Sequence, residues 1–293
     1  MSSLGSRPTS SPRARSAKPF FLMLGAVAPH VDGQRRGRPR NPLAAPRYGS
    51  RFEHARLPKP PSFNEADVSD KPRFTRKPPL SHVRKLEIRA LYRSRLRSLL
   101  SVDDAVRHIV GRLKRTGELN RTVIVFTSDN GFLLGEHRLT GKSVPYEESI
   151  GVPLLIRGPG IPHGQRRSQV VGNIDLAPTI LDLAGAPRGG MDGRSLLPLI
   201  HNPKKVRSRN LLIEMLRGSG HRPFRALRGS RYVLIKTQRD RHRGLGPLGE
   251  LYDLRKDPYE MDNRYRDPSY RDLRQKLSRR LKHLTGCRGS GCR

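Results

Sequence analysis

The chain has 293 residues, of which 34% are hydrophobic, and it contains no tryptophan. Its 59 lysines and arginines outnumber 25 aspartates and glutamates, which gives a formal net charge of +34. This length allows one large or two modest domains with a sizeable core. The charge favours contact with anions, but the arginines are scattered, and no zinc-knuckle spacing or RNA-binding motif is present. The composition therefore predicts nonspecific attraction to anions and no specific nucleic-acid partner.

The two ends of the chain differ in composition from the rest. Residues 1–17 are rich in serine, proline and arginine, and we expect a disordered leader there. Cys287 and Cys292 are the only cysteines, and two cysteines near one end do not form a disulfide framework. A small redox pair or a metal site between them is the less favoured alternative. We expect residues 285–293 to be a disordered tail.

A short apolar run at residues 20–28 follows the basic residues Arg13, Arg15 and Lys18 and ends in Ala-Val-Ala. A basic flank, a short apolar run and such an ending are typical of a secretory signal peptide. The alternative is a buried strand that carries the following His30 toward a site. The run is too short to cross a membrane, and we find no other candidate span. The sequence leaves the cellular compartment undetermined.

A helical pattern covers residues 81–116, where apolar side chains recur at three- and four-residue steps. Gly117 is expected to end this helix. Its adjacent carboxylates, Asp103 and Asp104, resemble a catalytic pair, but we expect them to face solvent or to cap a kink. The apolar positions that define the helical face are Leu99, Val102, Val106, Val110 and Leu113.

Further elements alternate between helix and strand, which is typical of an α/β fold. The pattern predicts strands at 123–126, 152–156, 210–215, 232–237 and 250–253, of which the last two form an antiparallel hairpin. A helix is predicted from Asp175 to Leu183, with Pro178 in its first turn. A final helical stripe is formed by Tyr270, Leu273, Leu277, Leu281 and Leu284.

Polar side chains follow the strand at 123–126 directly, in Ser128-Asp129-Asn130-Gly131. We interpret the β-branched run as a buried parallel strand that delivers these side chains to a ligand crevice. The Asp129 carboxylate and the Asn130 amide offer hard oxygen ligands for Ca²⁺ or Mg²⁺. Lys142 follows with a positive charge for an anion, so the pattern indicates a site for a phosphate or sulfate ester. The alternative is an ordinary turn after a strand.

Several long motifs in one order resemble the sulfatase family of the alkaline phosphatase superfamily. The resemblance covers residues 18–284 and implies that the 20–28 run is a strand ending in an active-site histidine, His30. It implies a partial alkaline-phosphatase-like sheet sandwiched by helices at 18–205. It also implies a small C-terminal antiparallel sheet with a helix at 206–284. The motifs are TSDNGFLLGEH, GK, PYEESI, VPLLIRGPG, NIDLAPTILDLAG, DGRSLLPL, GELYDL and DPYE.

The resemblance also implies roles for particular residues. Asp129 and Asn130 are expected to bind Ca²⁺ or Mg²⁺, and Lys142 to hold a sulfate oxygen. His30 is expected to donate a proton to the leaving oxygen. His137 would either contact the substrate or act as a packing histidine, the role that we favour. The implied substrate is a sulfated small molecule or glycan.

The chain departs from the family pattern in its nucleophile. The family forms formylglycine from a C-x-P-S-R or S-x-P-S-R motif, and neither motif occurs in this sequence. The N-terminal aspartate pair that supplies the other metal ligands is also absent. We therefore predict a truncated sulfatase with no, or trace, activity alone, and a separately encoded N-terminal half as a candidate partner.

Two other functions remain open. One is a phosphodiester or phosphonate hydrolase of the same superfamily, although phosphate-processing members often have a histidine where this chain has Asn130. The other is a non-catalytic remnant that binds acidic glycans through its arginines.

Overall fold

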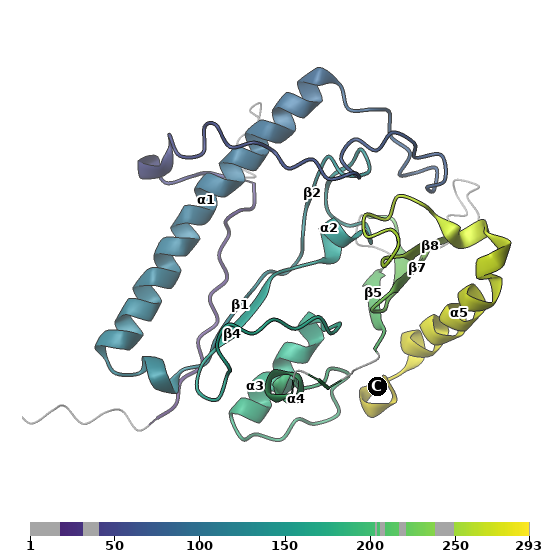
Figure 1. Ribbon diagram of the computed structural model, residues 1–293. Coiled ribbons are helices and arrows are strands. Elements are labelled where there is room, and N and C mark those ends of the chain that lie inside the picture. Colours follow the sequence, from purple (N-terminus) through teal and green to yellow (C-terminus); the bar gives the residue numbers. More distant parts are fainter. Residues whose placement is uncertain are drawn as a thin grey trace, which may run out of the picture.

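The computed structural model describes residues 18–31, 41–202, 204–205, 209–216, 221–237 and 249–292. A long helix and a two-stranded ribbon lie on one side of Figure 1, and a four-stranded sheet with the last long helix lies on the other. This arrangement confirms the expected mixed α/β class with a small antiparallel sheet. Among the described helices, none combines the length and apolar character that a membrane span requires. The predicted leader, residues 1–17, lies outside the described residues.

Helix α1 (His82–Arg115) confirms the predicted long helix. Ser81 caps its first turn, because the Ser81 hydroxyl accepts a hydrogen bond from the Arg84 amide at 3.1 Å. The helix ends just before Gly117, whose φ of 73° is a left-handed conformation that glycine adopts without strain. Both helix boundaries therefore follow from local sequence signals.

Asp104 differs from its expected solvent-facing position on α1. Its side chain is 12% exposed and accepts hydrogen bonds from Arg47 and Arg107, both at 2.6 Å. The Tyr48 hydroxyl also donates to it. Hydrogen bonds from Tyr48 and Arg47 hold the pKa of Asp104 well below its usual range. Asp104 therefore fastens the loop around Tyr48 to the helix.

Strand β1 (Ile124–Thr127) pairs antiparallel with β4 (Leu154–Arg157), so the prediction of a buried parallel strand was wrong. The two strands form a two-stranded sheet. The Phe126 side chain is 40% exposed and that of Leu155 is 60% exposed. The sequence pattern suggested full burial because both strands are apolar, but in the described chain each strand has only one neighbour and no second layer covers them.

Residues 18–30 were expected to form a strand, and the structure assigns none. The segment is extended, with Phe20 59% exposed and Met23 83% exposed. A strand requires a neighbour to accept its backbone hydrogen bonds, and none of the described strands pairs with this segment. At its end, the peptide between Ala28 and Pro29 is cis. His30 then closes a turn through a hydrogen bond from its amide to the Val27 carbonyl at 2.8 Å.

Short elements occupy the centre of the chain. The hairpin strands β2 and β3 precede α2, and α3 and α4 follow β4. The predicted helix at 175–183 is confirmed as α3, but the Asp175 side chain does not cap it. Asp175 instead accepts from the Gly172 amide at 3.0 Å and from Arg209 at 2.6 Å. The bounds are β2 (Leu133–Leu134), β3 (Thr140–Gly141), α2 (Glu147–Ile150), α3 (Leu176–Leu183) and α4 (Leu197–His201).

The C-terminal sheet contains four antiparallel strands in sequential order. The predicted hairpin between the last two strands is confirmed, whereas the strand at Phe224–Arg228 was not predicted because two arginines interrupt its apolar pattern. The strands are β5 (Leu211–Met215), β6 (Phe224–Arg228), β7 (Tyr232–Thr237) and β8 (Gly249–Asp253).

Helix α5 (Arg271–Gly286) confirms the predicted apolar stripe and lies beside this sheet in Figure 1. Leucines from both elements form one buried cluster. Burial of such side chains stabilises the packing by about 1.5–3 kcal/mol for each fully buried leucine. The buried members are Leu227, Leu234, Leu251, Leu277, Leu281 and Leu284.

The end of the chain is more ordered than expected. Cys287 and Cys292 form a disulfide, which was the less favoured alternative in the sequence analysis. A 3-10 helix covers Gly289–Cys292, and the Gly289 amide donates a hydrogen bond to Asp192. The predicted disordered tail is therefore wrong for the described residues up to 292. The remaining 3-10 helices are Pro46–Tyr48, Leu119–Arg121, Asn173–Asp175, Arg264–Arg266 and Pro268–Tyr270.

We expect Leu251→Ala to lower the free energy of unfolding by about 2–5 kcal/mol, because it removes apolar volume from the cluster beneath α5. Leu251 has no exposed surface. Val83→Ala is the control, because Val83 is 64% exposed and its replacement should change the free energy by less than about 0.5 kcal/mol. Urea denaturation followed by circular dichroism measures both, and equal losses would contradict the proposed core.

Candidate functional site

The loop after β1 presents Asp129 and Asn130 beyond the end of the strand. The Asn130 backbone amide donates to the Asp129 carboxylate at 2.9 Å, which folds the two residues into one compact turn. Gly131 then donates to the Ser149 carbonyl at 2.9 Å. A Cβ at Gly131 would lie 2.2 Å from the Glu148 carbonyl oxygen, so only glycine allows the loop to approach α2 this closely.

Lys142 lies directly beside this turn, as the sequence analysis expected. Its ammonium donates a hydrogen bond to the Asn130 side-chain oxygen at 2.9 Å. The hairpin of β2 and β3 explains the approach, since the pairing of Leu133 with Gly141 folds the chain back on itself. Lys142 and Asn130 are therefore in contact on an exposed surface, and the Asp129 carboxylate lies next to Asn130 in the same turn.

His30 lies on the exposed turn after the apolar segment. Its Nδ1 is 3.1 Å from the Val31 carbonyl oxygen, and in the described part of the chain no hydrogen bond or ion pair joins it to Lys142. Arg95 connects this turn to the loop beyond Asn130. It donates to the Pro29 carbonyl at 3.2 Å, and its guanidinium lies 4.3 Å from the centre of the Phe132 ring. Burial lowers the pKa of Arg95.

His137 occupies an interior position. Its side chain is 1% exposed, its Nδ1 is 2.7 Å from a Glu65 oxygen, and its ring centre lies 4.4 Å from that of Tyr146. The segment around Ser62 and Glu65 lies against the histidine, because the His137 amide donates to the Ser62 carbonyl at 2.7 Å. Contact with a substrate requires an accessible imidazole, so this burial argues against the substrate-contacting alternative and supports the packing role that the sequence favoured.

Glu148 and Glu260 lie beside His137, and the sequence did not identify either glutamate as a site residue. His137, Glu148 and Glu260 each offer one ligand atom, and these three atoms lie within 4.8 Å of one another. Burial raises the pKa of Glu260 well above its usual value. Burial alone would lower the pKa of His137, but the neighbouring Glu148 and Glu65 outweigh it and raise that pKa to about 9. The only sequence signal was that both glutamates lie within the quoted motifs PYEESI and DPYE.

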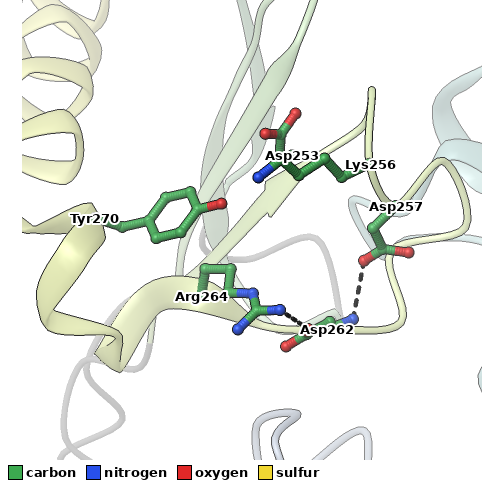
Figure 2. Close-up of a pocket in the computed structure, with 6 residues that line it drawn as sticks. All are labelled: Asp253, Lys256, Asp257, Asp262, Arg264 and Tyr270. Carbon is green, nitrogen blue, oxygen red and sulfur yellow. Dashed lines mark hydrogen bonds and ion pairs between the residues drawn. The ribbon is translucent and has the colours of Figure 1, made fainter.

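Figure 2 shows a separate cavity of about 300 Å³ beyond the end of β8. Arg264 forms an ion pair with Asp262, and the Asp262 amide donates to Asp257 at 2.9 Å. Asp253 is paired with Arg231 at 2.6 Å. Carboxylates balance the cations here, so this lining is unsuited to a sulfate group. The lining residues are Asp253, Lys256, Asp257, Asp262, Arg264 and Tyr270.

The fold is of the mixed α/β class, and comparison with known proteins identifies the family within that class. The sulfatase family profile matches residues 12–186. A second profile, N-sulphoglucosamine sulphohydrolase C-terminal, matches residues 135–286. The chain belongs to the sulfatase family.

Particular relatives support the same conclusion. N-acetylglucosamine-6-sulfatase from Bos taurus is 32% identical in an alignment of 312 positions. This alignment covers 95% of this chain and 53% of that protein. The structure of BT4656 in complex with its substrate D-glucosamine-2-N,6-O-disulfate is 31% identical with a TM-score of 0.62, covering 68% and 41% of the two chains. Phosphonate monoester hydrolase SpPMH from Silicibacter pomeroyi is 27% identical with a TM-score of 0.67, covering 85% and 54%. The chain thus spans about half the length of the relatives that it matches.

We expect Arg231→Gln to lower the free energy of unfolding at pH 7, because it removes the ion pair with Asp253. The hydrogen bond from Arg231 lowers the pKa of Asp253 in the folded protein. The contribution of this pair is therefore present above the unfolded pKa, near 4, and is lost as pH falls through the lower folded pKa.

Urea denaturation from pH 7 down to about pH 2.5 measures this dependence, and the difference between wild type and Arg231→Gln should shrink across the acid range. Arg255→Gln is the charge-matched control, since Arg255 is exposed and two residues from Asp253. A difference that stayed constant with pH, or that Arg255→Gln reproduced, would exclude the Arg231 ion pair as its cause.

Proposed function

We propose that this chain binds sulfate esters at the surface formed by Asp129, Asn130 and Lys142, and that it contributes this site to sulfate ester hydrolysis. The observation that carries the proposal is the 2.9 Å contact between the Lys142 ammonium and the Asn130 side chain. A lysine cation held there stabilises negative charge on a bound sulfate oxygen and on the transition state.

We propose Ca²⁺ or Mg²⁺ as the cation at this surface. Asp129 and Asn130 supply only oxygen donors, which is the chemistry that these hard ions prefer, so the residues fit the ion. When bound, the ion would polarise the sulfate ester and stabilise developing negative charge. Lys142 would orient the anion through its positive charge, and Asp129 would hold the Asn130 backbone in place.

Formylglycine does not fit the residues of this sequence. No cysteine precedes Cys287, the two cysteines form a disulfide, and the C-x-P-S-R and S-x-P-S-R motifs are absent. Loss of one member of a cooperating catalytic set removes most of the rate. We therefore propose turnover only for an assembly that includes the nucleophile motif.

His30 is the proposed proton donor to the leaving oxygen. Its exposed turn is tethered through Arg95 to the segment that follows Asn130. This tether supports a position at the edge of the same surface. A histidine is suited to proton donation near neutral pH because its charge changes in that range.

We propose a sulfated amino sugar as the substrate class. The support is the similarity to N-acetylglucosamine-6-sulfatase and to a structure that holds a sulfated glucosamine. The net charge of +34 would also attract sulfated glycans. Phosphonate ester hydrolysis is the second candidate, because the chain is also similar to a phosphonate monoester hydrolase.

The binding test uses D-glucosamine 6-sulfate and Ca²⁺ with the purified chain in isothermal titration calorimetry. We expect Lys142→Ala to weaken binding about tenfold or more, a loss of about 1.4 kcal/mol. Lys142→Arg should retain most of the affinity, and Lys114→Ala, at an exposed helix position, controls for the lost charge. Equal affinity in wild type and Lys142→Ala would exclude this surface as the sulfate site.

Two further measurements separate the alternatives. Tighter binding of a phenyl phosphonate monoester than of the sulfated sugar would favour the phosphonate hydrolase. Heparin affinity that survives the loss of both Asp129 and Lys142 would favour a remnant that binds acidic glycans. We expect no, or trace, hydrolysis of an aryl sulfate by the chain alone, and turnover that disappears in Lys142→Ala would contradict that prediction.

A further inference from the structure

A buried cluster outside the proposed sulfate site contains three side-chain atoms that share an unusual property. His137 Nε2, Glu148 Oε2 and Glu260 Oε1 are each shielded from solvent and have no hydrogen-bond partner within the described part of the chain. The three residues come from the loop after β2, from α2 and from the segment after β8. Buried polar atoms without partners are costly, so their convergence requires an explanation.

Each residue is anchored by its other polar atom, which leaves the unpartnered atom directed at the cluster. Glu148 Oε1 accepts from the Ser62 hydroxyl at 3.0 Å. Glu260 Oε2 accepts from the Glu147 amide at 2.8 Å. One ligand atom from each of the three residues lies within 4.8 Å of those of the other two.

The imidazole of His137 is oriented in the way that metal-binding histidines are. Its Nδ1 lies 2.7 Å from Glu65, and Glu65 in turn accepts from the Lys71 ammonium at 3.0 Å. The Glu65 carboxylate accepts from Nδ1, so Nε2 is the nitrogen that a metal ion can bind once the ion displaces its proton. A carboxylate behind a ligating histidine is the usual supporting arrangement at metal sites.

The separation between His137 Nε2 and Glu148 Oε2 is 3.7 Å. This distance is too long for a hydrogen bond. It is close to the spacing of two ligand atoms that share one metal ion, since each such atom lies about 2.0–2.2 Å from the ion.

We propose that His137, Glu148 and Glu260 form a structural site for one transition-metal ion of the Zn²⁺ or Mn²⁺ class. One imidazole nitrogen with two carboxylates suits these ions better than Ca²⁺ or Mg²⁺, which prefer oxygen ligands alone. A divalent ion also balances the two carboxylate charges in a buried environment.

The site would join the C-terminal unit to the loop that carries Asp129 and Asn130. Glu260 follows the four-stranded sheet, whereas Glu148 lies in α2, next to the Ser149 carbonyl that accepts from Gly131 at 2.9 Å. An ion bound to both glutamates would therefore stiffen the proposed sulfate-binding loop from behind without contacting the substrate.

The test is metal binding to the chelator-stripped full chain, with Zn²⁺ in calorimetry and Co²⁺ as a spectroscopic probe. We expect one ion per chain, a visible Co²⁺ absorption band, and a thermal midpoint that rises by several degrees with Zn²⁺. Glu260→Gln keeps the side-chain shape and should weaken Zn²⁺ binding at least tenfold. Glu214→Gln, at an exposed strand position, controls for the lost charge.

Asp129→Asn separates this ion from one at the proposed sulfate site, because it should leave Zn²⁺ affinity unchanged. Equal Zn²⁺ affinity in folded Glu260→Gln and wild type would overturn the proposal. The proposal would also be overturned if the wild-type chain bound no Zn²⁺ and NMR showed a doubly protonated His137 imidazole. Protons rather than a metal ion would then balance the charges of the cluster. The Co²⁺ spectrum of the wild type decides the matter if the variant does not fold.

Discussion

The structure depends on the buried hydrogen-bonded network around His137. Glu65 and Lys71 lie on one side of the imidazole and Glu148 on the other, and His137, Glu65 and Lys71 are each 1% exposed. Removing one partner from such a network leaves an uncompensated charge in the interior, which costs several kcal/mol. Apart from the isolated bridge between Phe63 and Glu136, no strand pairing joins these segments in the described residues, so the network helps to hold them together.

This network also determines where the candidate sulfate site can form. The isolated bridge between Phe63 and Glu136 brings the early loop against the β2–β3 hairpin. The hairpin then returns the chain so that Lys142 reaches Asn130. The exposed site is therefore supported by a buried layer of charged residues and by an apolar cluster in which Leu133 and Tyr146 pack against the C-terminal sheet.

The two halves of the molecule are stabilised by different means. The C-terminal sheet and α5 enclose a leucine cluster with almost no exposed surface. The ribbon of β1 and β4, in contrast, leaves Phe126 and Leu155 exposed, and the apolar residues from Phe20 to Val27 lie in an extended segment. Exposed apolar surface of this kind marks a place where further protein can pack.

The sequence by itself determined the elements that local signals define. Periodic leucines and valines followed by Gly117 predicted α1, a leucine stripe predicted α5, and the motif after the strand at 123–126 placed Asp129 and Asn130 together. The sequence motifs assigned Lys142 to the same site as Asp129 and Asn130. The structure adds the β2–β3 hairpin, which brings Lys142 to Asn130.

Only the tertiary structure decided the pairing of β1 with β4, the order of the C-terminal tail and the burial of His137. His137 meets a glutamate 72 residues away in sequence, and Glu260 accepts from an amide 113 residues away. Helical periodicity and capping act over a few residues, whereas such contacts arise only when distant segments pack. The chemistry of a residue type is therefore readable in the chain, but its accessibility depends on which other segments cover it.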